Sequence, residues 1–278
     1  MKVAVKDLRE LALSAAAGAG QLLTEYRSRG LTIRSKSSHT DPVSEADESA
    51  ERSILDTILA VRPDDGFLGE EDQANRPGTT GLRWVVDPLD GTVNYVYGIP
   101  LWCVSIACED SDGAVVGVVH HPGAGETFVA ARGLGAHRFG PDEFEQELSV
   151  STPPDLGRTL LATGFAYDAV TRAGQGRMAA AMLSHVRDLR RGGAAALDLA
   201  WTAAGRVDAY LEHGLKPWDW AAGALLVREA GGRVERLLHD FGSGPKQGMI
   251  AGGDATVGWL QALVASGQLE HGLDTELT

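Results

Sequence analysis

One segment in the first half of the chain combines residue types that can bind both a metal ion and a phosphate ester. Its sequence is Trp84-Val85-Val86-Asp87-Pro88-Leu89-Asp90-Gly91-Thr92. We expect a buried strand that carries Asp87 and Asp90 to its carboxyl end, where Pro88 stops the hydrogen-bond ladder. Gly91 would let backbone amides approach an anion, and Thr92 adds a hydroxyl. Carboxylates beside such amides would repel a phosphate unless cations lay between them, so the segment predicts a metal-dependent phosphate-ester site.

Acidic residues elsewhere in the chain can complete this site. Glu70 follows a short apolar run at an expected strand end, Asp219 lies at the mouth of an expected helix, and Asp47 lies in the first turn of another. Mg²⁺ prefers oxygen ligands and keeps several waters and substrate oxygens. Glu70, Asp87, Asp90 and Asp219 would therefore supply ligands for two ions, which together can activate an attacking water and neutralise a leaving oxygen.

The elements that must position these residues begin with helices. Apolar residues at helical spacing predict amphipathic helices over residues 5–28 and about 44–61, and Ser44 and Asp47 could cap the second. The pattern then changes to strands, with a hairpin signal at Asp112-Gly113. We expect a largely antiparallel sheet after the two helices.

After residue 154 the pattern alternates between strands and helices, which is typical of an α/β arrangement. Strands are expected over 160–163, 207–211 and 249–251, and helices over about 173–183, 194–204, 218–230 and up to 264. No flexible linker separates the two halves, 1–150 and 151–278, so we expect them to share an extensive interface. The tail after Gly267 should be frayed.

The overall charge limits the partners of the chain. Its 278 residues include 25 basic and 38 acidic ones, a net charge of −13, which argues against nucleic-acid binding as the main task. No apolar stretch reaches transmembrane length, so no membrane partner is expected. Acidic and basic residues interrupt the apolar core that an N-terminal signal peptide needs. Cys103 and Cys108 are typical of buried thiols in a reducing compartment, so we expect a cytoplasmic location.

Three segments resemble signatures of the inositol monophosphatase family. They are Gly69-Glu70-Glu71, Trp84 through Thr92 with Val93-Asn94-Tyr95, and Trp218-Asp219 through Ala230-Gly231-Gly232. Their order and spacing agree with the family, and the resemblance covers about residues 5–265. It implies an α/β (α+β) fold, a layered α-β-α-β-α sandwich of the inositol monophosphatase and fructose-1,6-bisphosphatase type, with the metals where the two halves meet. It also implies a homodimer that Li⁺ inhibits.

The resemblance implies a metal-binding role for five residues. Glu70, Asp87 and the backbone carbonyl of Leu89 match the family's ligands of a first, tighter Mg²⁺. Asp87 would bridge to a second ion, which Asp90 and Asp219 complete. A third, weaker ion near Glu70 is common in relatives, so the cofactor would be two to three Mg²⁺ ions per site.

The resemblance also implies the groups that act on water and phosphate. Thr92 and Asp47 match the pair that polarises the attacking water, and the amides of Gly91 and Thr92 match the phosphate cradle. Lys36 falls where the family keeps a lysine near the active-site loop. We expect in-line attack on phosphorus without a covalent enzyme intermediate.

The second half would supply most contacts to the substrate's alcohol portion. The residues that match the family's substrate contacts are Gly91, Thr92, Gly193, Ala195, Glu212 and Asp219. Glu212 would accept hydrogen bonds from ring hydroxyls, and Ala194 stands where some relatives have a threonine. The preceding Arg190-Arg191 could attract an anionic substrate or form salt bridges at a helix start, and both interpretations remain open.

These features predict a Mg²⁺-dependent phosphomonoesterase that acts on a small phosphorylated polyol, myo-inositol monophosphate. Val93-Asn94-Tyr95 resembles the inositol phosphatases more than the nucleotide-phosphate branch. Histidinol phosphate, fructose 1,6-bisphosphate and 3′-phosphoadenosine 5′-phosphate remain open as alternative substrates. Some bacterial relatives also associate with transcription machinery, which leaves a binding role as an alternative of another class. The filled ligand positions argue against a purely binding protein.

Overall fold

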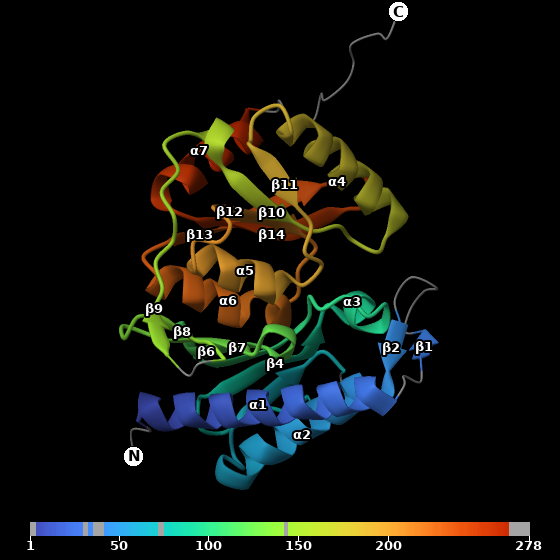
Figure 1. Ribbon diagram of the computed structural model, residues 1–278, viewed down its shortest axis with the longest axis vertical. Coiled ribbons are helices and arrows are strands. Elements are labelled where there is room, and N and C mark those ends of the chain that lie inside the picture. The colour runs from blue at the N-terminus through green and yellow to red at the C-terminus, as the bar shows by residue number, and fades with distance from the viewer. Residues whose placement is uncertain (1–3, 30–32, 36–41, 72–74, 142–143, 267–278) are drawn as a thin grey trace, which may run out of the picture.

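Two β-sheets and the helices around them form the layers of the protein (Figure 1). The computed structural model describes residues 4–29, 33–35, 42–71, 75–141 and 144–266, and of residues 33–35 and 42–44 it describes the backbone alone. Lys36 and the tail after Gly267, both named in the sequence predictions, lie outside these ranges. The helices are α1 (Val5–Arg29), α2 (Glu45–Val61), α3 (Thr92–Val96), α4 (Ala169–Met182), α5 (Ala195–Ala203), α6 (Pro217–Glu229) and α7 (Asp254–Ala265).

The first sheet has seven strands and belongs to the first half of the chain. In spatial order its strands are β3 (Gly66–Gly69), β4 (Arg83–Asp90), β5 (Cys103–Asp110), β6 (Gly113–His121), β7 (Glu126–Ala131), β8 (Ala136–Phe139) and β9 (Glu145–Glu147). β3 and β4 are parallel and the other pairs are antiparallel, which confirms the predicted sheet. A separate two-stranded sheet joins β1 (Ile33–Ser35) and β2 (Pro42–Ser44).

The second sheet has five strands and mixes parallel and antiparallel pairs. Its spatial order is β11 (Asp188–Arg190), β10 (Leu160–Thr163), β12 (Ala209–His213), β14 (Pro245–Gly252) and β13 (Arg233–Asp240). β10 is parallel to β11 and β12, whereas β14 is antiparallel to β12 and β13.

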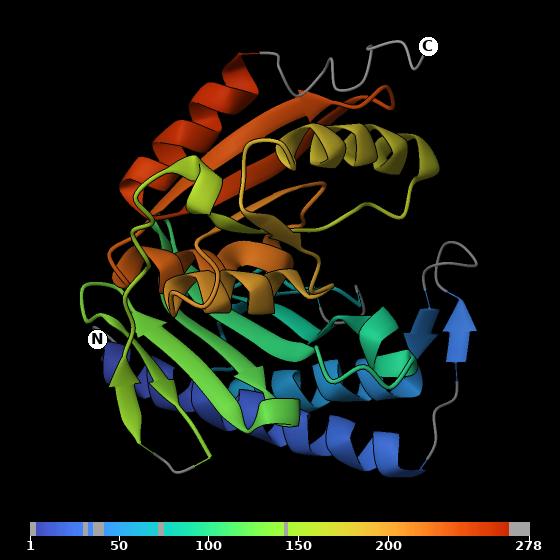
Figure 2. The ribbon, with the colours of Figure 1, turned by 45° about the horizontal axis from the view of Figure 1, so that its top comes forward.

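The helices cover both faces of each sheet, as Figures 1 and 2 show. α1 and α2 pack on the outer face of the seven-stranded sheet, α5 and α6 lie between the sheets, and α4 and α7 cover the outer face of the five-stranded sheet. This arrangement is the predicted α-β-α-β-α sandwich. Alternation along the inner strands explains it: Leu161 and Leu211 are buried against α4 and α7, whereas Ala162 and Tyr210 face α5 and α6.

The course of β4 differs from the prediction. The strand continues through Pro88 to Asp90, although a proline has no N–H to donate to the ladder. Asp87 pairs with Ser105 and the next pair is Asp90 with Cys103, so the register shifts between the two aspartates. The bulge accommodates Pro88 without ending the strand, so Asp87 and Asp90 both lie near the carboxyl end of β4.

Most other boundaries lie within a few residues of the predicted ones. The hairpin at Asp112-Gly113 is confirmed as β5–β6, with Gly113 at a φ of 108°. α4 begins four residues earlier than predicted because the carboxylate of Asp168 accepts a hydrogen bond from the amide of Thr171 at 2.8 Å and caps the helix. β12 runs two residues further than predicted. The strands β1, β2, β9, β11 and β13 were not predicted. None of the described helices is both long and apolar enough to cross a membrane.

An ion-pair cluster joins the seven-stranded sheet to the loop after α5. The carboxylate of Glu126, which is 5% exposed, accepts hydrogen bonds from Arg206, 2.7 Å for one of them, and from Arg138. The hydrogen bond of Arg206, and then that of Arg138, lowers the pKa of Glu126 in spite of its burial. Because the pKa of Glu126 is lower in the folded state than in the unfolded state, its ion pairs stabilise the protein fully at pH values above the unfolded-state pKa. This stabilisation is lost as the pH falls through the folded-state pKa.

We therefore expect Glu126→Gln to lower the free energy of unfolding by roughly 2–3 kcal/mol at pH 7. The difference from the wild type should shrink as the pH falls below about 4.5. Urea denaturation at a series of pH values measures both effects. Glu147→Gln, an exposed position on β9, is the control and should change stability by less than about 0.5 kcal/mol. A pH-independent loss in Glu126→Gln would contradict the electrostatic explanation.

Candidate active site

One cavity brings together predicted site residues from distant parts of the chain. The predicted residues that line it are Glu70, Asp87, Leu89, Asp90, Gly91, Thr92, Gly193, Ala195, Glu212 and Asp219. Other residues that line it are Gly164, Phe165, Tyr167, Arg191, Ala194 and Leu215. The cavity holds about 630 Å³ of space, part of it open to solvent. Asp47 is the predicted residue that does not line the cavity.

The carboxylate of Asp87 is buried at the carboxyl end of β4. Its Oδ1 accepts a hydrogen bond from the amide of Leu89 at 3.0 Å. Burial raises the pKa of Asp87 well above its usual value, and the negative charges of Glu70 and Asp90 raise it further. These neighbouring carboxylates would therefore favour a cation bound beside Asp87.

Asp90 connects β4 to the start of α5. Its Oδ2 accepts a hydrogen bond from the amide of Ala196 at 2.6 Å and lies 3.7 Å from the thiol of Cys103. Burial raises the pKa of Asp90 to about 6, although the amide hydrogen bonds act in the opposite direction. This hydrogen bond at the amino end of α5 thus connects Asp90, in the first half of the chain, to the second half.

Asp219 lies in the first turn of α6, as the sequence predicts. Its Oδ2 accepts a hydrogen bond from the amide of Lys216 at 2.6 Å, and Pro217 occupies the first turn without needing a partner for an N–H. Burial raises the pKa of Asp219 well above its usual value, and the charges of Asp90 and Glu70 add to the shift. The first turn of α6 therefore holds the carboxylate of Asp219 in place in the cavity that Asp90 and Glu70 also line.

The turn after β4 presents Gly91 and Thr92 to the cavity. Gly91 has a φ of 92°, and a Cβ there would lie 2.8 Å from the carbonyl oxygen of Leu101, so the position requires glycine. The hydroxyl of Thr92 donates to the carbonyl oxygen of Leu89 at 3.0 Å. Asp47 is fully buried in the first turn of α2, and its charge contributes to the raised pKa of Asp87.

Glu212 and Gly164 form another wall of the cavity. The carboxylate of Glu212 accepts a hydrogen bond from the hydroxyl of Tyr210 at 2.8 Å, and burial raises the pKa of Glu212 to about 7. Gly164 allows this approach, because a Cβ there would collide with the carboxylate. Gly164 and Phe165 were missed in the sequence. The signal was available, since they follow β10, and parallel strands such as β10 and β12 end at the same edge of a sheet.

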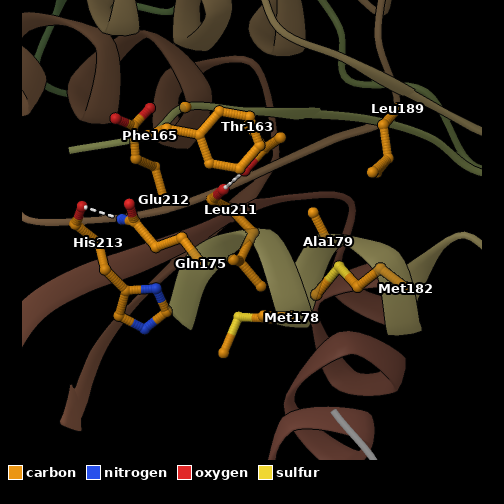
Figure 3. A pocket seen from close by; sticks show the side chains of 11 residues that line it. Thr163, Phe165, Gln175, Met178, Ala179, Met182, Leu189, Leu211, Glu212 and His213 are labelled. Carbon is orange, nitrogen blue, oxygen red and sulfur yellow. Dashed lines mark hydrogen bonds between the residues drawn. The ribbon is translucent and has the colours of Figure 1, made fainter. Parts of the chain in front are cut away.

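A smaller and more apolar hollow shares Gly164, Phe165 and Glu212 with the cavity (Figure 3). Its remaining lining comes from the end of β10, α4, β11 and β12, and the side chain of Gln175 donates a hydrogen bond to the carbonyl oxygen of His213 at 3.0 Å. Glu212 therefore separates an acidic space from an apolar one.

The donor set of the acidic cavity suits hard divalent cations. The carboxylates of Glu70, Asp87, Asp90 and Asp219 and the backbone carbonyl of Leu89 are all oxygen donors and belong to residues that line one space. The charges of Glu70 and Asp90 raise the pKa values of Asp87 and Asp219. Among the described residues, no three acidic, histidine or cysteine side chains already surround a single point as a metal would require. Backbone amides hold one oxygen each of Asp87, Asp90 and Asp219. A carboxylate has two oxygens, so these hydrogen bonds and metal coordination are compatible.

Comparison with known proteins identifies relatives over nearly the whole chain. Residues 4–268 match the model of the inositol monophosphatase family. Inositol-1-monophosphatase of Mycobacterium leprae is 45% identical over 250 residues, which cover 88% of this chain and 84% of the relative. Nus factor SuhB of Escherichia coli is 40% identical over 236 residues, 84% of this chain and 85% of the relative. The crystal structure of the extragenic suppressor protein SuhB from Bartonella henselae superposes with a TM-score of 0.83 at 34% identity, covering 96% of this chain and all of the other.

The layered fold and its acidic cavity, together with these relatives, define a phosphatase, a hydrolase of phosphoric monoesters. The chain belongs to the inositol monophosphatase family. The resemblance of the three sequence signatures to this family is thereby confirmed.

Proposed function

We propose that the chain hydrolyses myo-inositol monophosphate to inositol and phosphate in a Mg²⁺-dependent reaction. The observation that supports this best is the single cavity in which all predicted site residues except Asp47 meet. The M. leprae relative is named an inositol-1-monophosphatase, which supports the substrate.

In this proposal the acidic residues hold the cofactor. Glu70, Asp87, the carbonyl oxygen of Leu89, Asp90 and Asp219 would bind two to three Mg²⁺ ions, for which their oxygen donors and shared negative charge are suited. When bound, the ions supply Lewis-acid activation of a water molecule and neutralisation of the leaving oxygen.

The groups around Thr92 would position the reacting atoms. The hydroxyl of Thr92, together with the carboxylate of Asp47, orients the attacking water for in-line approach to phosphorus. The amides of Gly91 and Thr92 donate hydrogen bonds to phosphoryl oxygens, whose negative charge they help to stabilise in the transition state. The left-handed backbone at Gly91 leaves room for this contact.

The alcohol portion would bind on the side of Glu212. Its carboxylate accepts hydrogen bonds from ring hydroxyls, and the backbones of Gly193 and Ala195 contribute further polar groups. Asp219, which lines the same cavity, would contact both a metal ion and the alcohol portion. Buried hydrogen-bonding groups discriminate strongly against alcohols that leave them unpaired.

A phosphate-release panel tests the proposed substrate. The catalytic efficiency, kcat/KM, is measured with Mg²⁺ for myo-inositol 1-phosphate, histidinol phosphate, fructose 1,6-bisphosphate and 3′-phosphoadenosine 5′-phosphate. We expect inositol 1-phosphate to exceed each alternative by at least about tenfold, which corresponds to about 1.4 kcal/mol of transition-state binding. A higher kcat/KM with any of the other three esters would contradict inositol 1-phosphate as the substrate and favour that ester instead.

A second candidate function is association with the transcription machinery, because the E. coli relative is named a Nus factor. Co-purification of the full chain with RNA polymerase from its own cells tests this role, and absence of the polymerase in the purified fraction would argue against it. The homodimer, inhibition by Li⁺ and the cytoplasmic location belong to the primary proposal. Two buried free thiols, Cys103 and Cys108, support a reducing compartment.

A further inference from the structure

The side chain of Asn94 links the turn after β4 to a loop of the second half. Asn94 lies in α3, two residues after Thr92, and is 5% exposed. Its side-chain amide donates to the carbonyl oxygen of Leu101 at 2.6 Å and to that of Gly192, 98 positions further along the chain, at 2.8 Å. An asparagine amide has two N–H groups, so both are used. One buried side chain thus fastens α3 to the loop before α5.

The backbone of Gly192 is also held from the opposite side. Its amide donates to the carboxylate of Asp198, which is buried in α5. A Cβ on Gly192 would lie 2.4 Å from Oδ1 of Asp198, so this close approach requires a glycine. Buried side chains of the two halves therefore bind the N–H and the C=O of the same residue, and they leave the loop little freedom to move.

Asn94 lies between two groups of residues that line the cavity. On one side, the carbonyl oxygen of Leu101 is so close to Gly91 that a Cβ on Gly91 would lie 2.8 Å from it. On the other side, a Cβ on Gly193 would lie 3.0 Å from Nδ2 of Asn94. Gly91, Gly193 and Ala195 line the cavity, whereas Asn94 is not among its described lining residues. The contacts of Asn94 therefore connect the turn proposed to bind the phosphoryl group to the loop proposed to contact the alcohol portion.

We propose that Asn94 is a positioning residue that sets the spacing between these two parts of the cavity. A phosphate ester is held at both ends only when the turn at Gly91 and the loop at Gly193 lie at the separation that its phosphoryl and alcohol portions require. A small displacement of either part lowers the rate because the reacting groups lose their alignment. The inference rests on the proposed phosphatase function and adds to it a residue that touches neither the ester nor a metal ion.

Hydrogen exchange of backbone amides tests whether Asn94 holds the loop. The wild type is compared with Asn94→Ala and with Tyr95→Phe as the matched control. Tyr95 is the next residue of α3, is fully buried, and donates its hydroxyl to the carbonyl oxygen of Leu23 in α1. The control thus loses a buried side-chain-to-backbone hydrogen bond that faces α1. We expect exchange over residues 190–194 to rise by at least about tenfold in Asn94→Ala and by less than about twofold in Tyr95→Phe.

Kinetics of the same proteins test whether the spacing matters for the reaction. The value of kcat/KM is measured for inositol 1-phosphate with Mg²⁺, and the inhibition constant of inorganic phosphate is measured in the same assay. We expect Asn94→Ala to lower kcat/KM by about ten- to a hundredfold. The inhibition constant should stay within about threefold of the wild type, because inorganic phosphate has no alcohol portion that must reach the loop at Gly193. Tyr95→Phe should change both quantities by less than about threefold.

Several results would overturn the inference. If exchange over residues 190–194 did not rise in Asn94→Ala, the side chain would not hold the loop. If kcat/KM in Asn94→Ala stayed near the wild-type value, the spacing would not limit the reaction. If kcat/KM and the affinity for inorganic phosphate fell by the same factor, Asn94 would support the active site as a whole. If the wild type did not hydrolyse inositol 1-phosphate, the proposed function would fail, and hydrogen exchange alone would decide whether Asn94 holds the loop.

Discussion

We expect Asp90→Asn to lower kcat for Mg²⁺-dependent phosphate release by about three orders of magnitude. Asp90 would be a ligand of the second ion, and losing one charged oxygen donor weakens charge stabilisation in the transition state by about 4 kcal/mol. The asparagine oxygen can still accept the hydrogen bond from the amide of Ala196, which the wild-type carboxylate accepts at 2.6 Å. The fold should therefore survive.

Stability measurements separate this effect from unfolding. Without Mg²⁺, Asp90→Asn should be at least as stable as the wild type, because it removes one of several mutually repelling buried charges. Asp56→Asn, an exposed position on α2, is the matched control and should keep both activity and stability. Turnover by Asp90→Asn within tenfold of the wild type would refute the metal-binding role of this residue.

Removal and return of Mg²⁺ should change both activity and thermal stability. A chelator should abolish phosphate release, and Mg²⁺ should restore it. At 100 times its dissociation constant one bound ion adds about 2.7 kcal/mol to the free energy of unfolding, which raises Tm by roughly 5 °C for a chain of this size. The physical reason is that the ion relieves repulsion among the carboxylates of the cavity, where the charges of Glu70 and Asp90 raise the pKa values of Asp87 and Asp219.

The controls for this experiment follow from the same electrostatics. Potassium chloride at equal ionic strength screens surface charges and should give less than half of the shift in Tm. Asp90→Asn should show a smaller Mg²⁺-dependent shift than the wild type. An equal shift in the wild type and in Asp90→Asn would place the stabilising ion elsewhere.

Which acidic residues line the cavity could be predicted from the sequence because local chemistry specifies their positions. An apolar strand with Asp87 and Asp90 near its carboxyl end, a glycine at a left-handed position and a proline that starts α6 before Asp219 are all features of neighbouring residues. The prediction that Pro88 ends the strand was wrong, because a bulge accommodates a missing N–H without ending the pairing. The division into halves at residue 150 stays a prediction.

What the sequence left open depends on long-range contacts. Arg190 and Arg191 are adjacent in the chain, and the fold separates them: Arg190 pairs with Asp188 two residues earlier, whereas Arg191 lines the cavity together with residues of the first half. The proximity of Asp47 to Asp87 joins α2 to β4 and has no local signal. β11 is three residues long, and β13 alternates half-buried and exposed side chains with few apolar ones, so neither has a clear strand pattern.

The most direct measurement is anomalous diffraction from crystals of this protein grown with Mn²⁺, which can replace Mg²⁺ at oxygen-donor sites. We predict at least two anomalous peaks in the cavity, in contact with Glu70, Asp87, Asp90 and Asp219. A well-ordered cavity without such peaks, or ions bound only at surface carboxylates outside it, would contradict the account.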